Sequence, residues 1–162
     1  MTRFSDMPDN SRVWVYQCNR KLLDSELKFV NQQALKFIDA WTAHDMLLKA
    51  CFEIRYGIFL ILFVDEKQAI ASGCSIDKSV HFILQLEKEL GVLFTNRMLF
   101  AYRNQGEEIS IVSKTDFEKS VAGNKISDNT IVFNTLVQTK SELENNFEIP
   151  FAQSWHKQLV IG

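Results

Sequence analysis

Cys74 is the residue whose position in this sequence is best suited to chemistry. It lies between Gly73 and Ser75, where a helix is expected to begin after the apolar run Ile58–Val64 and a polar loop. A thiol at a helix N-terminus lies at the positive end of the helix dipole, which favours the reactive thiolate. We therefore predict Cys74 as the nucleophile if the protein is an enzyme. The plainer alternative is a small buried residue that fills space, because free cysteines are often buried.

His44 is the candidate base for that thiol. It lies in the turn Thr42–Asp45, which is expected to follow the first helix. An imidazole within hydrogen-bonding reach of a cysteine could accept its proton, so Cys74 and His44 together form the catalytic prediction under the enzyme hypothesis. A histidine that satisfies a carbonyl group of the turn explains His44 equally well.

The same junction of loop and helix is also a candidate binding site. Gly73, Cys74 and Ser75 occupy the expected first turn, where backbone N–H groups have no acceptor within the helix and can bind an anion. Asp77 and His81 are four residues apart, a spacing at which a carboxylate and an imidazole could orient each other. We predict these five residues as ligand-binding residues. The alternative for the last two is that Asp77 interacts only with the helix dipole and that His81 is solvated.

Two acidic residues, Asp65 and Glu66, end the apolar run. They could bind a hard cation, but neighbouring strand residues face opposite sides of a sheet, so one site would normally receive only one of them. The three cysteines, Cys18, Cys51 and Cys74, lie far apart in the chain, without the closely spaced ligand pairs of zinc sites. We expect neither a metal nor an organic cofactor.

Hydrophobic periodicity predicts the elements that position these residues. One helix is expected from Asp24 to about Trp41 and another from about Ser75 to Leu90, each with apolar residues on one side. The expected strands are Val13–Tyr16, Lys49–Tyr56, Ile58–Val64, Met98–Tyr102, Ile109–Val112 and Thr130–Val137. Capping boxes that start at Thr115 and Thr139 predict two short helices.

This order of elements predicts an α+β fold. The first hundred residues follow a ferredoxin-like β-α-β-β-α-β order, which gives a mostly antiparallel sheet with two long helices on one face, followed by C-terminal strands and short helices. A mixed sheet covered on both faces is the alternative. The length of 162 residues and the lack of a linker predict a single domain, 1–162, in which residues 1–11 form a flexible tail.

Composition excludes several classes of function. The formal net charge is −2, with no cluster of basic residues, so we expect no binding to nucleic acid. No apolar run reaches the ~18–20 residues of a membrane helix, and the first dozen residues lack the apolar core of a signal peptide. Three sparse cysteines are typical of a reducing compartment, so we expect a cytoplasmic protein.

Several stretches of the sequence form a recognisable set: Trp41–His44, Val64–Glu66, Ser72–Asp77, Val132–Asn134 and Glu142–Asn145. They resemble a family of short bacterial proteins that are often labelled "ABC transporter ATPase". The resemblance extends from Val13 to about His156 and implies a compact cytosolic domain, with no catalytic residues that can be transferred. The sequence contains no Gly-Lys pair and therefore no phosphate-binding P-loop, so we predict no nucleotide hydrolysis.

Two functional hypotheses remain. The first is a non-enzymatic binding or interaction module that holds a small anionic ligand or a protein partner at Gly73–Asp77, with a homodimer as one form in which it could act. The second is a thiol-dependent enzyme or redox sensor that uses Cys74. We favour the first because the sequence contains no complete catalytic motif.

Overall fold

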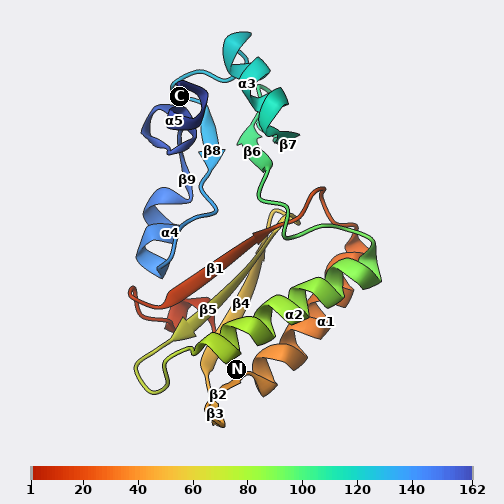
Figure 1. The fold of residues 1–162 in the computed structure, drawn as a ribbon, viewed down its shortest axis with the longest axis vertical. Coiled ribbons are helices and arrows are strands. Elements are labelled where there is room, and N and C mark those ends of the chain that lie inside the picture. The colour runs from red at the N-terminus through yellow and green to blue at the C-terminus, as the bar shows by residue number, and fades with distance from the viewer. Residues whose placement is uncertain (1, 162) are drawn as a thin grey trace. The chain divides into compact units, whose positions relative to one another are not determined.

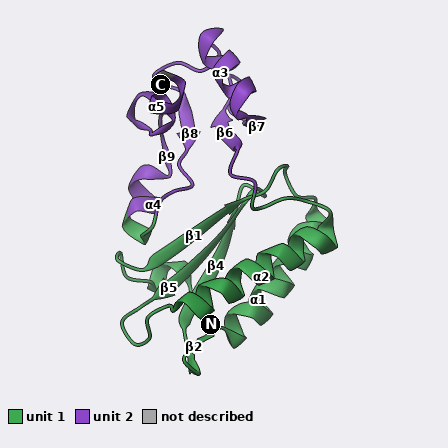
Figure 2. Ribbon diagram, in the orientation of Figure 1, with its two compact units in different colours: residues 1–95, 138–141 green, residues 96–137, 142–162 purple. Residues whose placement is uncertain are grey.

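The computed structural model describes residues 2–161 and the side chains of residues 2–160. The chain groups into two compact units, which are coloured separately in Figure 2. Unit 1 contains Met1–Thr95 and Gln138–Ser141, and unit 2 contains Asn96–Val137 and Glu142–Gly162. Helices and antiparallel sheets occur in both units, which confirms the predicted α+β class. The single domain stays a prediction.

Unit 1 is built on a three-stranded antiparallel sheet (Figure 1). Its elements are η1 (Phe4–Asp6), β1 (Arg12–Gln17), α1 (Asp24–Ala40), β2 (Thr42–Ala43), β3 (Met46–Leu47), β4 (Lys49–Arg55), β5 (Phe59–Asp65) and α2 (Gly73–Leu90). The strand order is β1-β5-β4, and both outer strands run antiparallel to β5. β1 and β4 are therefore parallel and flank β5, which is the split β-α-β unit of the predicted ferredoxin-like pattern.

The hairpin β4–β5 forms as the sequence predicts. Tyr56 (φ 58°) and Gly57 (φ 66°) adopt left-handed backbone conformations, and the Ile58 N–H donates to the Arg55 carbonyl at 3.0 Å. All seven residues of β5 are buried, as expected of a strand covered on both faces.

Both long helices pack on one face of this sheet, as predicted (Figure 1). The buried contacts come from Val30 and Ile38 of α1, Ile83 and Leu86 of α2, and Leu60, Leu62 and Val64 of β5. The rings of Phe37 and Phe82 stack between the helices with centroids 4.6 Å apart. Gly91, in a left-handed conformation, ends α2 directly after Leu90, where the second helix was expected to end.

The last strand of the predicted ferredoxin-like pattern lies elsewhere. The expected strand Met98–Tyr102 forms β6 (Leu99–Arg103), which belongs to the sheet of unit 2. The ferredoxin-like pattern would put this strand at the free edge of β1. That edge is occupied instead by Gln138–Ser141, which we call the return segment. The Val13 N–H donates to the Gln138 carbonyl at 3.0 Å, and Arg12 forms an antiparallel bridge with Thr139. A segment late in the sequence thus closes the sheet edge.

The return segment also holds the N-terminal residues of unit 1. The Lys140 ammonium donates to the Met7 carbonyl at 2.7 Å and lies 4.6 Å from the ring centroid of Phe4. The Phe4 ring packs edge-on against Phe63, on the sheet face opposite the helices, with centroids 5.1 Å apart. Met7 is buried, so the segment predicted as a tail contributes to the core; Met1 lies outside the described residues.

Unit 2 contains a four-stranded antiparallel sheet of order β7-β6-β8-β9. Its elements are β6, β7 (Ile109–Ser113), α3 (Lys114–Ala122), β8 (Ile131–Phe133), α4 (Lys140–Asn146, whose first two residues belong to unit 1), β9 (Glu148–Pro150), η2 (Phe151–Gln153) and α5 (His156–Ile161). The hairpin β6–β7 confirms the two strands predicted around the turn at 104–107. No helix within residues 2–161 is long and apolar enough to span a bilayer.

Two local predictions in unit 2 are wrong. The expected strand Thr130–Val137 is shortened to β8 because the Asn134 side chain accepts hydrogen bonds from the Leu136 N–H and the Trp155 indole, each at 3.0 Å. Such a turn made by an asparagine side chain ends a strand. Helix α3 is capped by Ser113, whose hydroxyl accepts from the Asp116 N–H at 3.2 Å, and not by Thr115.

Candidate functional site

Hydrogen bonds made by the side chains of Ser72 and Ser75 stabilise the start of α2. Helix α2 begins at Gly73, and its N-cap residue Ser72 accepts a hydrogen bond from the Ser75 N–H at 3.2 Å. The Ser75 hydroxyl, which is buried, donates back to the Ser72 carbonyl at 2.8 Å. Gly73 and Cys74 are exposed, and their N–H groups are in the first turn, where the helix offers no acceptor.

A second hairpin lies beside this first turn. Strands β2 and β3 pair through Thr42 with Leu47 and Ala43 with Met46. The Trp41 indole N–H donates to the Ser75 carbonyl at 2.8 Å, and the Lys78 ammonium donates to the Thr42 hydroxyl at 3.2 Å. Two hydrogen bonds therefore hold the hairpin to α2. We call the residues 42–47 and 72–78 the α2 rim.

The α2 rim brings the two predicted catalytic residues to the same end of unit 1. His44 is exposed in the turn of the hairpin, with its neighbour Asp45, and both have positive φ (50° and 64°). Cys74 is exposed as well. Among the described residues, no hydrogen bond joins the imidazole of His44 to the thiol of Cys74. The structure thus places the pair on one rim without assembling a dyad.

The other two cysteines are in different surroundings. Cys18 and Cys51 are buried, and burial raises the pKa of both thiols, that of Cys51 to about 12 with the help of the neighbouring Glu53 carboxylate. A thiol with so high a pKa is protonated and unreactive at neutral pH. Cys74 is therefore the cysteine of this chain that a reagent in solution would reach first.

Asp77 and His81 both lie on the exposed side of α2. Within the described part of the chain, neither side chain has a hydrogen bond or an ion pair, so the two groups do not orient each other. Their contribution as ligand-binding residues stays a prediction. Among residues 2–161, no three His, Cys, Asp or Glu side chains are grouped so that they could hold a metal ion.

The carboxylates of Asp65 and Glu66, at the end of β5, accept hydrogen bonds from backbone N–H groups of the loop that follows. The Asp65 carboxylate accepts from the Lys67 N–H at 3.0 Å and lies 3.4 Å from the Lys49 ammonium. The Glu66 carboxylate accepts from the Ala71 N–H at 2.9 Å and lies 3.7 Å from the Arg12 guanidinium. These two residues therefore stabilise the loop that leads into α2.

Exposed apolar side chains are the feature of this end of unit 1 that sequence reasoning missed. Met46 and Leu47 of the hairpin are 56% and 65% exposed, and Ile70, in the loop before α2, is 70% exposed. Nothing in the pattern of residues 42–47 indicated a hairpin, because each strand has only two residues.

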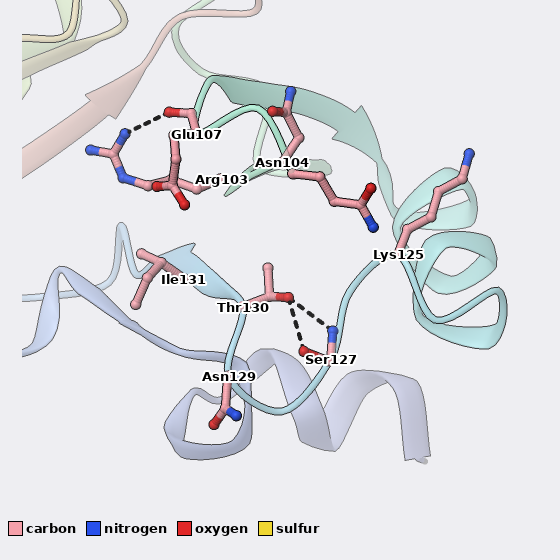
Figure 3. A pocket seen from close by; sticks show the side chains of 9 residues that line it. Arg103, Asn104, Glu107, Lys125, Ser127, Asn129, Thr130 and Ile131 are labelled. Atoms are coloured by element: carbon pink, nitrogen blue, oxygen red, sulfur yellow. Dashed lines mark hydrogen bonds between the residues drawn. The ribbon is translucent and has the colours of Figure 1, made fainter.

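Unit 2 contains a hollow of about 240 Å³ between the turn that joins β6 to β7 and the loop before β8 (Figure 3). Four of its eight polar lining residues, Arg103, Asn104, Ser127 and Thr130, make side-chain hydrogen bonds. The Arg103 guanidinium donates to the Glu107 carbonyl at 3.2 Å and to the Glu148 carboxylate at 2.8 Å. The Thr130 hydroxyl accepts from the Ser127 N–H at 2.9 Å. The hollow is thus a polar depression in the surface of unit 2.

Comparisons with protein-family models, with curated proteins and with solved structures find no match to this chain. The function of the chain must therefore be inferred from the geometry of its two units.

Proposed function

We propose that this protein is a binding module that receives an anionic group of its partner at the α2 rim. The observation that carries the proposal is the exposed first turn of an 18-residue helix, at which Gly73 and Cys74 present backbone N–H groups to solvent. Such a turn combines directed donors with the positive end of the helix dipole. The Lys78 ammonium, one turn further along α2, adds a positive charge.

The exposed apolar residues favour a macromolecular partner over a free anion alone. Met46 and Leu47 lie on the hairpin that is hydrogen-bonded to α2. A partner that carries a carboxylate or phosphate beside an apolar side chain would contact both parts of the α2 rim. We place this module in the cytoplasm, where its three free cysteines would remain reduced.

The anion site can be tested with inorganic phosphate and two substitutions at one position. Gly73 is the first residue of α2, its preceding residue is extended, and a side chain added there meets no atom within 4 Å. Proline is tolerated at such a position, so Gly73→Pro removes one N–H group while it preserves the helix. Gly73→Ala keeps the N–H group and serves as the control.

We expect phosphate to shift the amide resonances of Gly73 and Cys74 in a saturable way, which chloride at equal ionic strength does not reproduce. Gly73→Pro should weaken this binding several-fold, whereas Gly73→Ala should leave it unchanged. Equal binding by the two variants, or shifts spread over the whole chain, would contradict the proposal.

The alternative is the thiol-dependent enzyme or redox sensor. The specific observation in its favour is that the exposed Cys74 and the hairpin that carries His44 are held together by the Lys78–Thr42 hydrogen bond. The test is the rate of alkylation of each cysteine as a function of pH. The enzyme hypothesis requires that Cys74 react faster than free cysteine below neutral pH and that His44→Ala remove this advantage.

A further inference from the structure

Strand β7 is an edge strand with an open outer side. It stands at the end of the order β7-β6-β8-β9 and pairs only with β6. For residues 109–112, which the structure describes fully, no backbone hydrogen bond is made on the side away from β6, whereas the carbonyl of Ser113, the N-cap residue of α3, accepts the first hydrogen bond of that helix. An open edge of this kind is a template for another strand.

The register of the hairpin shows which groups point outward. The Asn104 N–H donates to the Glu108 carbonyl at 2.8 Å, so these two residues form a hydrogen-bonded pair. Such pairs recur every second residue in an antiparallel ladder. Ser110 and Val112 therefore direct their backbone groups toward β6. The backbone groups of Ile109 and Ile111 and the N–H of Ser113 point to the open side, whereas the Ser113 carbonyl belongs to the first turn of α3.

The other long edge strand of the molecule shows how an edge is normally protected. β4 carries Lys49, Glu53 and Arg55, and the last two form an ion pair at 2.9 Å. β7 has the sequence Ile-Ser-Ile-Val-Ser, with no charge, no proline and no bulge in its five consecutive pairs with β6. Charges, prolines and bulges are the usual devices against strand addition, and β7 has none of them.

We propose that a second copy of this chain adds to β7 in antiparallel orientation, with the Ile111 residues of the two copies opposite each other. In this register the outward groups match, because the two Ile111 residues form a hydrogen-bonded pair and the Ser113 N–H of each copy can donate to the Ile109 carbonyl of the other. The four-stranded sheets of the two copies then form one continuous sheet.

Charge complementarity selects this register. With the two-fold axis at Ile111, Glu108, which directly precedes β7, would lie near Lys114, the first residue of α3, in the other copy, and this contact would occur twice. Glu108 is exposed, and Lys114, which pairs with Glu118 at 2.6 Å in its own helix, is partly exposed. An axis moved by one residue brings Glu108 opposite Val112 or toward Asp116, and the complementarity is lost. The surface lies in unit 2 and is independent of the α2 rim.

Charge reversal tests the pairing on the full chain. Glu108→Lys places lysine opposite Lys114, Lys114→Glu places glutamate opposite Glu108, and the double variant restores opposite charges. In low salt, sedimentation should show a dimer for the wild type and about a tenfold higher dissociation constant for each single variant, because both copies lose a favourable pair. The double variant should return to within about twofold of the wild type.

Hydrogen exchange provides a readout that tests the register directly. As dimer forms, the amides of Ile111 and Ser113 should become protected, whereas those of Ser110 and Val112 are already protected by β6. A wild type that stays monomeric at the highest attainable concentration would overturn the proposal. A dimer that is insensitive to both single variants, or one that leaves the Ile111 amide unprotected, would also overturn it.

Discussion

Unit 1 buries a lysine ammonium whereas unit 2 buries a histidine imidazole, and the surroundings of the two groups differ. Lys140 is 6% exposed and donates to a backbone carbonyl beside an aromatic ring. His156 is 1% exposed, lies among the rings of Phe100, Phe117 and Trp155, and has one hydrogen-bonding side chain, the Ser154 hydroxyl at 2.6 Å.

The difference shows two ways of keeping a titratable group inside a small core. Unit 1 supplies a carbonyl acceptor and the face of an aromatic ring to its ammonium. Unit 2 supplies an apolar environment, and burial lowers the pKa of His156 to about 4, so its imidazole stays neutral at pH 7. The stability of unit 2 should therefore depend on pH through His156.

The largest effects should come from the aromatic residue at the centre of each unit. Trp41→Ala removes a ring that is 1% exposed and also the indole N–H that is bonded to the Ser75 carbonyl. We expect the free energy of unfolding of unit 1 to fall by about 4 kcal/mol. Phe117→Ala, at an equally buried position in unit 2, should cost about the same without a lost hydrogen bond.

Two substitutions of Trp41, to alanine and to phenylalanine, separate the contribution of packing from that of the hydrogen bond to Ser75. Hydrogen exchange in β5 reports on unit 1, and exchange in β6 reports on unit 2. Trp41→Phe keeps most of the ring but not the donor, so it should recover most of the loss and leave a deficit of about 1–2 kcal/mol. Full recovery would show that the bond to Ser75 contributes nothing to holding the hairpin on α2.

Acid should destabilise unit 2 through His156. Its pKa of about 4 in the folded state lies below the ordinary 6.5, so the unfolded chain binds the proton first as the pH falls. The stability that comes from the neutral imidazole is complete above pH 6.5 and decreases down to pH 4, by about 3 kcal/mol in total. Urea unfolding monitored in unit 2 across this range should show the loss.

His156→Phe is the matched control, because it fills the aromatic cluster and cannot be protonated. The variant should lack this part of the pH dependence, although carboxylates still titrate in both proteins. An imidazole resonance of His156 that titrates near pH 6.5 in the folded protein would contradict the comparison between the units.

The elements that could be predicted are those with local signals. The seven-residue apolar run of β5, the turn at Tyr56–Gly57 and the helical arcs of α1 and α2 depend on residues close in sequence. The exposed position of the α2 start was uncertain, because the sequence could not distinguish an exposed Cys74 from a buried one. Burial depends on what packs over the loop, and that contact is not local.

The parts that could not be predicted depend on pairings between distant segments. The return segment bonds to β1 across more than a hundred residues, and β6 joins the sheet of unit 2 instead of the one that precedes it. The position of the hairpin β2–β3 beside the start of α2 likewise depends on the hydrogen bond between Trp41 and Ser75, which are distant in sequence. The carboxylate of Glu87, on the buried arc of α2, accepts from the Thr95 N–H at 2.9 Å, which no helical pattern reveals.

Removal of the buried ammonium should loosen the N-terminal segment of unit 1. Lys140→Met leaves the Met7 carbonyl without its 2.7 Å donor, and we expect a loss of about 2 kcal/mol. The Phe4 ring should then separate from Phe63, whose neighbour on β4 is Cys51. Alkylation of Cys51, after Cys74 has been blocked, should therefore become faster.

Lys67→Met is the control for the loss of one positive charge, because Lys67 is exposed and its N–H, not its ammonium, bonds to Asp65. It should leave the rate of Cys51 alkylation unchanged. Equal rates in all three proteins would mean that the buried ammonium of unit 1 does not hold the N-terminal segment.

The smallest effects should be seen at two helix caps that match each other across the units. The Ser72 hydroxyl accepts from the Ser75 N–H and the Ser113 hydroxyl accepts from the Asp116 N–H, both at 3.2 Å. Ser72→Ala and Ser113→Ala should each cost about 1 kcal/mol, because the N–H group loses its acceptor. Aspartate at either position can still accept that hydrogen bond and should restore most of the stability.

The two caps differ in the number of hydrogen bonds that fix the capping serine. The Ser72 carbonyl also accepts from the buried Ser75 hydroxyl, so Ser72 is fixed by two hydrogen bonds, whereas Ser113 is an exposed cap. Ser72→Ala should therefore leave α2 starting at Gly73, with exchange faster only for the Ser75 amide. If Ser72→Ala instead speeds exchange through the first two turns of α2, the geometry of the α2 rim depends on that one hydroxyl, and phosphate binding should weaken in the same variant.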